Sequence, residues 1–235
     1  MLDKFVTCPG EQDTILLYKT GPSGNQSTRH FITANTFHEA QRLGNMLGER
    51  IVEAIEQLTD ADYKDSVRLS SQHTCLMLPK KKFMSLHDAE EKEKLARSKL
   101  AELRGSKADM SEIRTAEVDL FGAEENKQLA GMAANGELDE VYESVLPAEI
   151  TLIGIGDSRF VFLPGELFVE YSLIIKKHAS QRTYVVSLAN GTLAGYIVTE
   201  EAEQEGGYEA SNSIFPAEAG RIIVNEVLAM IQKRG

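Results

Sequence analysis

The spacing of hydrophobic residues divides the first third of the sequence into segments typical of strands and helices. Residues 13–20 form a short, continuous apolar run that ends at Gly-Pro, which predicts a strand covered on both faces. In residues 35–58, apolar side chains recur at helical spacing behind a capping box of Thr36 and Glu39, which predicts an amphipathic helix. Residues 64–79 alternate and end in proline, which predicts a strand with one solvated face.

From Ser85 to about Val145 the composition changes to Ala, Glu, Lys, Leu and Arg with a helical period. Gly105 and Ser106 interrupt this pattern, so residues 86–145 are predicted to form an antiparallel helical hairpin inserted in the domain. We expect its charged faces to lie in water. The apolar positions expected to hold the two helices together are Leu95, Leu103, Ile113 and Leu120.

After Pro147 the strand signals return. Residues 148–166 predict a hairpin of two apolar strands around Gly156-Asp157, and the second strand leads directly into Pro-Gly-Glu. An amphipathic helix, another buried strand and a final helix follow. Strands that alternate with helices predict a single α/β domain over residues 1–235, with a mixed β-sheet flanked by helices and a protruding helical hairpin.

The charge balance excludes a general affinity for polyanions. Lys and Arg number 25 and Asp and Glu number 36, so the net charge is −11, which argues against binding to nucleic acid or to anionic lipid surfaces. The one basic cluster, residues 80–82, is better explained as a solvated turn than as a phosphate site. The two cysteines, Cys8 and Cys75, indicate neither a disulfide framework nor a thiolate zinc site, and we expect Cys75 to be buried.

The sequence contains no run of about 18 apolar residues and no hydrophobic signal-peptide region at its start. The chain as written is therefore expected to be soluble. Its localisation stays unknown, and a full-length protein could be cytoplasmic or secreted.

Three polar features follow predicted strands: the loop of residues 21–29, Glu166, and a glycine-rich acidic segment that contains Tyr196 and Tyr208. Each has an ordinary explanation, namely a turn, a helix cap and tyrosines that pack with a solvated hydroxyl. The five histidines form no closely spaced pair, and the loop lacks the Gly-Lys-Ser/Thr ending of a phosphate-binding loop. We predict nevertheless that the three features surround one cleft, because ligands gather at strand ends in α/β folds.

The order of "GNQS", "LPGE" and "AN…GYIVTEEAEQEGGYEAS" resembles the neutral, non-lysosomal ceramidase family, and most of all its bacterial ceramidase-like branch. That family consists of zinc amidases that cleave the N-acyl bond of ceramide into sphingosine and fatty acid. The resemblance covers the C-terminal half of the family's catalytic domain. It implies that Glu166 and Tyr196 are zinc ligands, that Tyr208 holds the substrate oxygen during catalysis, and that Ser27 is an active-site serine.

The sequence also departs from this family. The family's His-x-His-Ser-Gly-Pro motif, a second zinc-binding histidine and the general base belong to an N-terminal half that this sequence does not contain. Ser27 is followed by Thr28 and Arg29, where ceramidases often have Pro and Asn, which leaves the substrate open.

The first hypothesis is therefore the C-terminal half of a zinc-dependent, ceramidase-like amidohydrolase, which acts on an N-acyl lipid-like or other amide substrate. Its partner would be the N-terminal half of the same catalytic domain or another copy in a homo-oligomer, and this chain alone is expected to bind zinc weakly and to be inactive. The alternative is a non-catalytic α/β interaction module or a split subunit that retains relic motifs.

Overall fold

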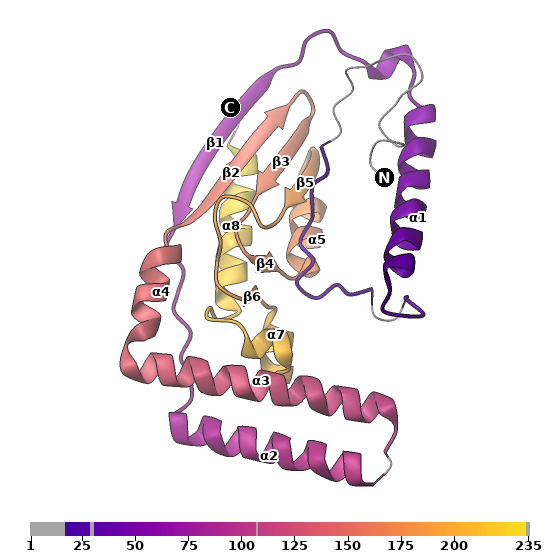
Figure 1. Cartoon of the computed structure of the whole chain (residues 1–235). Coiled ribbons are helices and arrows are strands. Elements are labelled where there is room, and N and C mark those ends of the chain that lie inside the picture. The colour runs from indigo at the N-terminus through magenta and orange to yellow at the C-terminus, as the bar shows by residue number, and fades with distance from the viewer. Residues whose placement is uncertain (1–16, 29–30, 107, 234–235) are drawn as a thin grey trace. The chain divides into compact units, whose positions relative to one another are not determined.

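The computed structural model describes residues 17–28, 31–106 and 108–233 (Figure 1). The chain divides into two compact units. The first unit runs up to Lys19 and again from Ser27 to Arg68, and the second holds Thr20–Gln26 and the chain from Leu69 onward.

The first unit is built around the predicted amphipathic helix, α1, which spans Phe37–Glu56. Thr36 is its N-cap, and its hydroxyl accepts a hydrogen bond from the Glu39 backbone N–H. The Glu39 carboxylate accepts from the Thr33 backbone N–H at 3.1 Å and pairs with Arg42 at 2.9 Å. The side-chain hydrogen bond from Arg42, followed by the bond from Thr33, lowers the pKa of Glu39 to about 2.

The strand predicted for residues 13–20 is not present where the structure describes this segment. Residues 17–20 have irregular backbone, Leu17 and Tyr18 are exposed, and residues 13–16 lie outside the described residues. The prediction was wrong because an apolar run becomes a strand only when a neighbouring strand offers a ladder of hydrogen bonds. The Ser187 N–H donates a hydrogen bond to the Thr20 carbonyl at 3.0 Å, but the described residues of this segment form no strand. The first unit ends in a short 3₁₀ helix, η2, at Asp60–Asp62.

A four-stranded mixed sheet forms the centre of the second unit, in the order β1-β2-β3-β5. β1 pairs with β2 and β2 with β3 in antiparallel fashion, and β3 pairs with β5 in parallel. The predicted mixed α/β class is thus confirmed. The strands are β1 at Leu69–Leu76, β2 at Ala148–Ile155, β3 at Ser158–Phe162 and β5 at Arg182–Val186.

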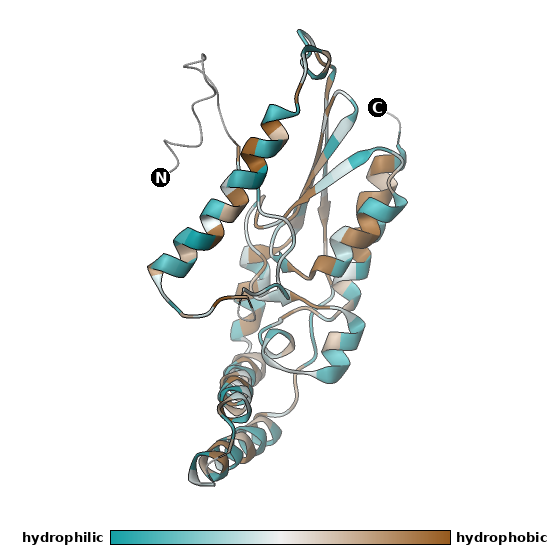
Figure 2. Ribbon diagram, turned by 90° about the vertical axis from the view of Figure 1, so that its right-hand side faces the viewer, coloured by the Kyte–Doolittle hydropathy of each residue, from teal (hydrophilic) through white to brown (hydrophobic). Residues whose placement is uncertain are grey.

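Two helices cover one face of this sheet. They are α5, Val169–His178, which lies between β3 and β5 along the chain, and α8, Glu218–Gln232. Residues on one side of β2 are buried toward them, and β2 contacts α8. Figure 2 shows the hydrophobic side of α8, the helix next to the C-terminus. The core residues on these elements include Ala148, Ile150, Leu152, Ile175, Ile223 and Val227.

The opposite face of the sheet carries an apolar strip. The alignment of β2, β3 and β5 places Ile153, Phe160 and Tyr184 side by side across three strands. The rings of Phe160 and Tyr184 are stacked, with centroids 5.1 Å apart. Tyr184 and Ile155 are exposed, so this face is less covered than the face below α5 and α8.

The segment between β1 and β2 is helical. It consists of α2 at Leu86–Gly105, α3 at Met110–Asn135 and α4 at Glu137–Val145. The Glu93 carboxylate pairs with Arg97 of α2 and with Lys127 of α3, so an ion-pair network links the two long helices. Leu95 is 68% exposed, so the prediction that it packs in the hairpin was wrong.

Four short elements of the second unit were not predicted. They are β4 at Glu166–Leu167, which pairs in parallel with β6 at Tyr196–Ile197, and the helices α6 at Glu200–Glu205 and α7 at Tyr208–Ser211. Elements of two to six residues are too short for a hydrophobic period to reveal them. Across the described part of the chain, no helix combines the length and the apolar character that a membrane span requires.

Two smaller predictions concern residues in and after β1, and the first of them was wrong. Cys75 is exposed, because it lies on the same face of β1 as His73, and its sulfur is 3.4 Å from the ring Nε2 of that histidine. The expected solvated turn at residues 80–82 is seen for Lys80 and Lys82, which are exposed, but not for Lys81, which is half-buried. The Lys81 ammonium donates to the Ala210 carbonyl at 2.7 Å, and burial lowers the pKa of this lysine. The other cysteine, Cys8, lies outside the described residues.

Candidate functional site

The two-stranded sheet of β4 and β6 brings together two of the predicted site residues. Glu166 and Tyr196 are direct partners in this parallel pair. Aligned residues of neighbouring strands project from the same face of a sheet, so the carboxylate and the phenol lie on one side. Glu166 is exposed and Tyr196 is half-buried.

A tight turn leads into Glu166. Gly165 has φ +80°, and a Cβ atom at this position would lie 3.0 Å from the Cβ of Leu193. The Gly165 carbonyl accepts a hydrogen bond from the Ser187 hydroxyl at 2.7 Å. Glu166 belongs to β4, whereas α5 begins at Val169, so the interpretation of Glu166 as the cap of that helix was wrong.

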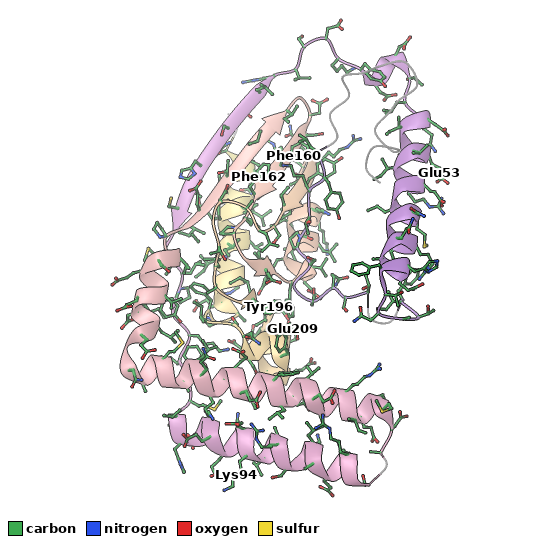
Figure 3. All side chains as sticks on the ribbon, viewed as in Figure 1. Glu53, Lys94, Phe160, Phe162, Tyr196 and Glu209 are labelled. Carbon is green, nitrogen blue, oxygen red and sulfur yellow. The ribbon has the colours of Figure 1, made fainter. Side chains whose placement is uncertain are left out.

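Tyr208, the first residue of α7, contacts Tyr196. The two ring centroids are 6.1 Å apart and the rings meet edge to face. Burial raises the pKa of Tyr196, and the charge of Glu166 adds to this effect, with smaller contributions from Tyr208 and Glu209. Figure 3 labels Tyr196 and Glu209, which lie close to each other. The site therefore favours a neutral, hydrogen-bearing phenol at Tyr196.

Helix α3 packs directly against α7. A Cβ atom at Gly122 of α3 would lie 3.2 Å from the Ser211 hydroxyl oxygen and 3.5 Å from the Cα atom of Tyr208. The Asn126 side chain donates a hydrogen bond to the Ser211 hydroxyl at 3.3 Å. The absence of a side chain at Gly122 thus allows α7 to approach α3 closely.

The first part of the predicted site loop, residues 21–26, packs directly against β4. The Gly24 backbone N–H donates to the Leu167 carbonyl at 2.9 Å. A Cβ atom at Gly24 would lie 2.6 Å from the carbonyl oxygen of Glu166, which is closer than any side chain tolerates. Glycine at this position is therefore required by the close approach of two backbones.

Asn25 connects the same loop to the start of α5. Its side-chain oxygen, Oδ1, accepts a hydrogen bond from the Val169 backbone N–H at 2.9 Å, and its side-chain nitrogen, Nδ2, donates to the Glu170 carboxylate at 2.8 Å. The N-cap position of α5 is Phe168, which offers no capping side chain, so Asn25 supplies the missing cap from a distant loop. This role of Asn25 was not predicted from the sequence. The only local indication was Phe168, an apolar residue at the N-cap position of α5.

The remaining candidate, Ser27, is the first residue of the segment that belongs to the other unit. Its assignment as an active-site serine stays a prediction. Arg29, at the end of the predicted loop, lies outside the described residues.

The loop after β5 stores backbone strain next to the Pro-Gly-Glu turn. Leu188 and Asn190 both have positive φ, at 55° and 59°. Asn190 tolerates this conformation, and its amide donates to the Thr151 hydroxyl at 3.2 Å and to the Phe162 carbonyl at 3.1 Å. Leu188, an exposed and branched side chain, gains no such compensation from its side chain.

Glu166 and Tyr196 make at most part of a metal site. A catalytic zinc ion normally has three protein ligands, and a phenol must lose its proton before it binds a metal well. The raised pKa of Tyr196 opposes that loss. Among the residues that the structure describes, no three His, Cys, Asp or Glu side chains are grouped closely enough to hold a metal ion. The residues that the structure describes therefore do not make a complete zinc site.

Comparison with known proteins adds no identification. No family model matches the sequence, and no curated protein matches it. A solved structure of neutral ceramidase from Pseudomonas aeruginosa is 18% identical over 36% of this chain, with a TM-score of 0.31. A structure described as ceramidase complexed with C2 is 17% identical over 37% of the chain, with the same TM-score. The matched regions cover 15% and 16% of those chains, and a similarity at this level carries no argument about fold or activity.

Proposed function

We propose that this chain is the C-terminal half of a zinc-dependent, ceramidase-like amidohydrolase that hydrolyses an N-acyl amide bond. The main support is the alignment of Glu166 with Tyr196 in the β4–β6 pair, with the ring of Tyr208 against that of Tyr196. These residues come from two of the three motifs on which the resemblance rests. The third motif contributes Gly24 and Asn25, which bind β4 and the start of α5.

The proposal gives each residue a chemical task. Glu166 and Tyr196 would contribute two ligands to the metal. Tyr208 would donate a hydrogen bond from its hydroxyl to the carbonyl oxygen of the substrate as negative charge develops there. The two histidine ligands and the general base would come from the N-terminal half of the catalytic domain or from another copy of the chain, because the described residues form an incomplete site.

The partner would be the N-terminal half of the same catalytic domain, or another copy of this chain in a homo-oligomer. The substrate would be an N-acyl lipid-like molecule or another amide, and the net charge of −11 disfavours nucleic acid as a ligand.

An amidase assay with a fluorogenic long-chain N-acyl amide tests this proposal. The chain is assayed with zinc, alone and after co-expression with a polypeptide that carries the His-x-His-Ser-Gly-Pro motif. We expect hydrolysis only from the pair, and a loss of about 100-fold or more in kcat for Tyr208→Phe in that pair. Glu166→Gln should also abolish activity.

Tyr63→Phe is the matched control, because Tyr63 is an exposed tyrosine that belongs to none of β4, β6 and α7. It should retain full activity. Amide hydrolysis that persists in both Glu166→Gln and Tyr208→Phe would refute the assignment of these residues.

A second candidate function is a non-catalytic interaction module. It is favoured by the apolar strip on the open side of the sheet, where Ile155 and Tyr184 are exposed. A stable complex between this chain and the co-expressed polypeptide, without amide hydrolysis, would support this function over the first.

A further inference from the structure

A groove of about 880 Å³ lies between α5, α6 and α8, within the second unit. Its volume falls in the range of sites that bind ligands or peptide side chains. None of the proposed catalytic residues lines it. The groove is therefore separate from the candidate site on β4 and β6.

The floor of the groove is apolar. Leu173 and Ile174 of α5 line it and are 56% and 40% exposed, while the adjoining Ser172 and Ile175 are buried. Val224 of α8 extends this surface. The opposite face of α5 is already packed in the core. Burial of the exposed aliphatic side chains by a ligand or partner would therefore be favourable.

The rim of the groove is strongly acidic. The carboxylates come from three elements: Glu170 of α5, Glu218 of α8, and Glu200, Glu201 and Glu203 of α6. Among the described residues that line the groove, Arg221 is the one cation, and it pairs with Glu218 at 3.3 Å. Burial raises the pKa of Tyr171 to about 12, and the charges of Glu201, Glu203, Glu170 and Glu200 add to the rise, so their negative potential acts on the groove wall.

Helix stability alone does not explain this arrangement. Carboxylates in the first turn of α6 interact favourably with the helix dipole. The same effect acts on Glu170 and Glu218, which lie in the first turns of α5 and α8. It explains each carboxylate separately, but not why the N-termini of three helices meet around one apolar groove. Convergence of like charges around an apolar floor costs electrostatic energy, which a bound cation would offset.

We propose that this groove binds a basic amphipathic segment of a partner protein, with its apolar side chains on Leu173 and Ile174 and its Lys or Arg side chains at the acidic rim. This is the helix-in-groove mode of recognition. Charge complementarity selects the occupant, because anionic partners are repelled by the rim. A second copy of this chain is disfavoured by its own net charge of −11.

Fluorescence anisotropy with labelled synthetic peptides tests the inference on the whole purified chain. The first probe is an amphipathic peptide of Leu and Lys, about four turns of helix long. Two comparison peptides replace every Lys by Glu or every Leu by Gln. The Leu/Lys peptide should bind at least about tenfold more tightly than either comparison peptide, and its affinity should fall as salt increases.

Two variants locate the binding. Glu200→Gln combined with Glu201→Gln should weaken the Leu/Lys peptide by about tenfold, and Leu173→Ser should weaken it by a similar factor. The matched control is Glu137→Gln with Glu140→Gln, which removes two exposed carboxylates from the first turn of α4 and changes the net charge equally. The control should bind like the wild type.

Three results would overturn the inference. They are equal weakening by the control, equal affinity for the Leu/Glu peptide, and self-association in sedimentation velocity that the Glu200→Gln/Glu201→Gln variant abolishes. The first two would show binding unrelated to this groove, and the third would identify a second copy as the occupant.

Discussion

At the scale of single residues, Gly24 and Asn25 show why a polar loop follows an apolar segment near the start of the chain. Gly24 allows the loop backbone to lie against the carbonyl of Glu166, and Asn25 uses both ends of its amide on α5. The glycine and the amide are thus required by tertiary contacts as well as by turn formation. The composition of the loop alone indicated only turn formation.

Asn25→Ala should destabilise the protein by about 1 kcal/mol, because it removes the acceptor of the Val169 N–H and the donor to Glu170. Urea unfolding measures this change. Gln26→Ala is the control, since the Gln26 side chain is exposed and its hydrogen bonds to described residues go to its neighbour Asn25. Equal effects of the two substitutions would show that the cap contributes nothing to stability.

Tyr171 should make stability depend on pH in the alkaline range. Its folded pKa is raised to about 12 by burial and by nearby glutamates, whereas the unfolded value is about 10. The resulting stabilisation is fully present below pH 10 and is lost as pH rises from about 10 to about 12, because only the unfolded chain releases the proton there. Urea midpoints over this range should fall more steeply for the wild type than for Tyr171→Phe.

Below about pH 9 the difference in midpoint between these two proteins should be constant. It should reflect the lost hydrogen bond from the Tyr171 hydroxyl to the Val198 carbonyl, which is 2.7 Å long. Parallel curves up to pH 12 would contradict the raised pKa.

At the scale of elements, the helical arm formed by α2 and α3 also packs against a part of the candidate site. Its second helix, α3, carries α7 and therefore Tyr208 on the face that contains Gly122. The hydrogen bond from Asn126 to the Ser211 hydroxyl fixes the same contact. The arm is thus a structural support for one of the candidate site residues.

Gly122→Val should destabilise the protein by about 1–3 kcal/mol, because the new side chain would collide with Ser211. Gly131→Val in the same helix is the control, since the nearest atom to a Cβ there is Leu86 Cδ1 at 3.9 Å. Hydrogen exchange should show faster exchange of the α7 amides only in the Gly122 variant. Unchanged exchange of the α7 amides would contradict the prediction that the contact with α3 stabilises α7 and Tyr208.

The elements that could be predicted from the sequence are those long enough to show a period. The spacing of apolar residues in α1, the α2–α3 arm and the β2–β3 hairpin matched the structure. β4 and β6 contain two residues each, so their pairing depends on packing that no local pattern encodes. The contact between Asn25 and Glu170 joins residues 145 positions apart, and no spacing rule reaches that far.

At the scale of the whole molecule, the chain leaves the first unit for residues 20–26 and returns to it at Ser27. The short excursion contributes the contacts of Gly24 and Asn25 to the second unit. Three of the four candidate site residues, Glu166, Tyr196 and Tyr208, belong to that second unit. Both proposed metal ligands, Glu166 and Tyr196, therefore belong to the second unit.

This chain alone should bind zinc weakly or not at all. The site on β4 and β6 offers one exposed carboxylate and one phenol, and burial together with Glu166 raises the pKa of that phenol. Two ligands, one of which must first lose a proton, fall short of the three that a catalytic zinc ion normally has. Calorimetric titration of the wild type with zinc should therefore show no tight one-to-one binding, and Glu166→Ala should reduce whatever weak heat is observed. Tight binding that Glu166→Ala abolishes would mean that the chain completes this site by itself, and tight binding that survives the substitution would place the metal at other residues.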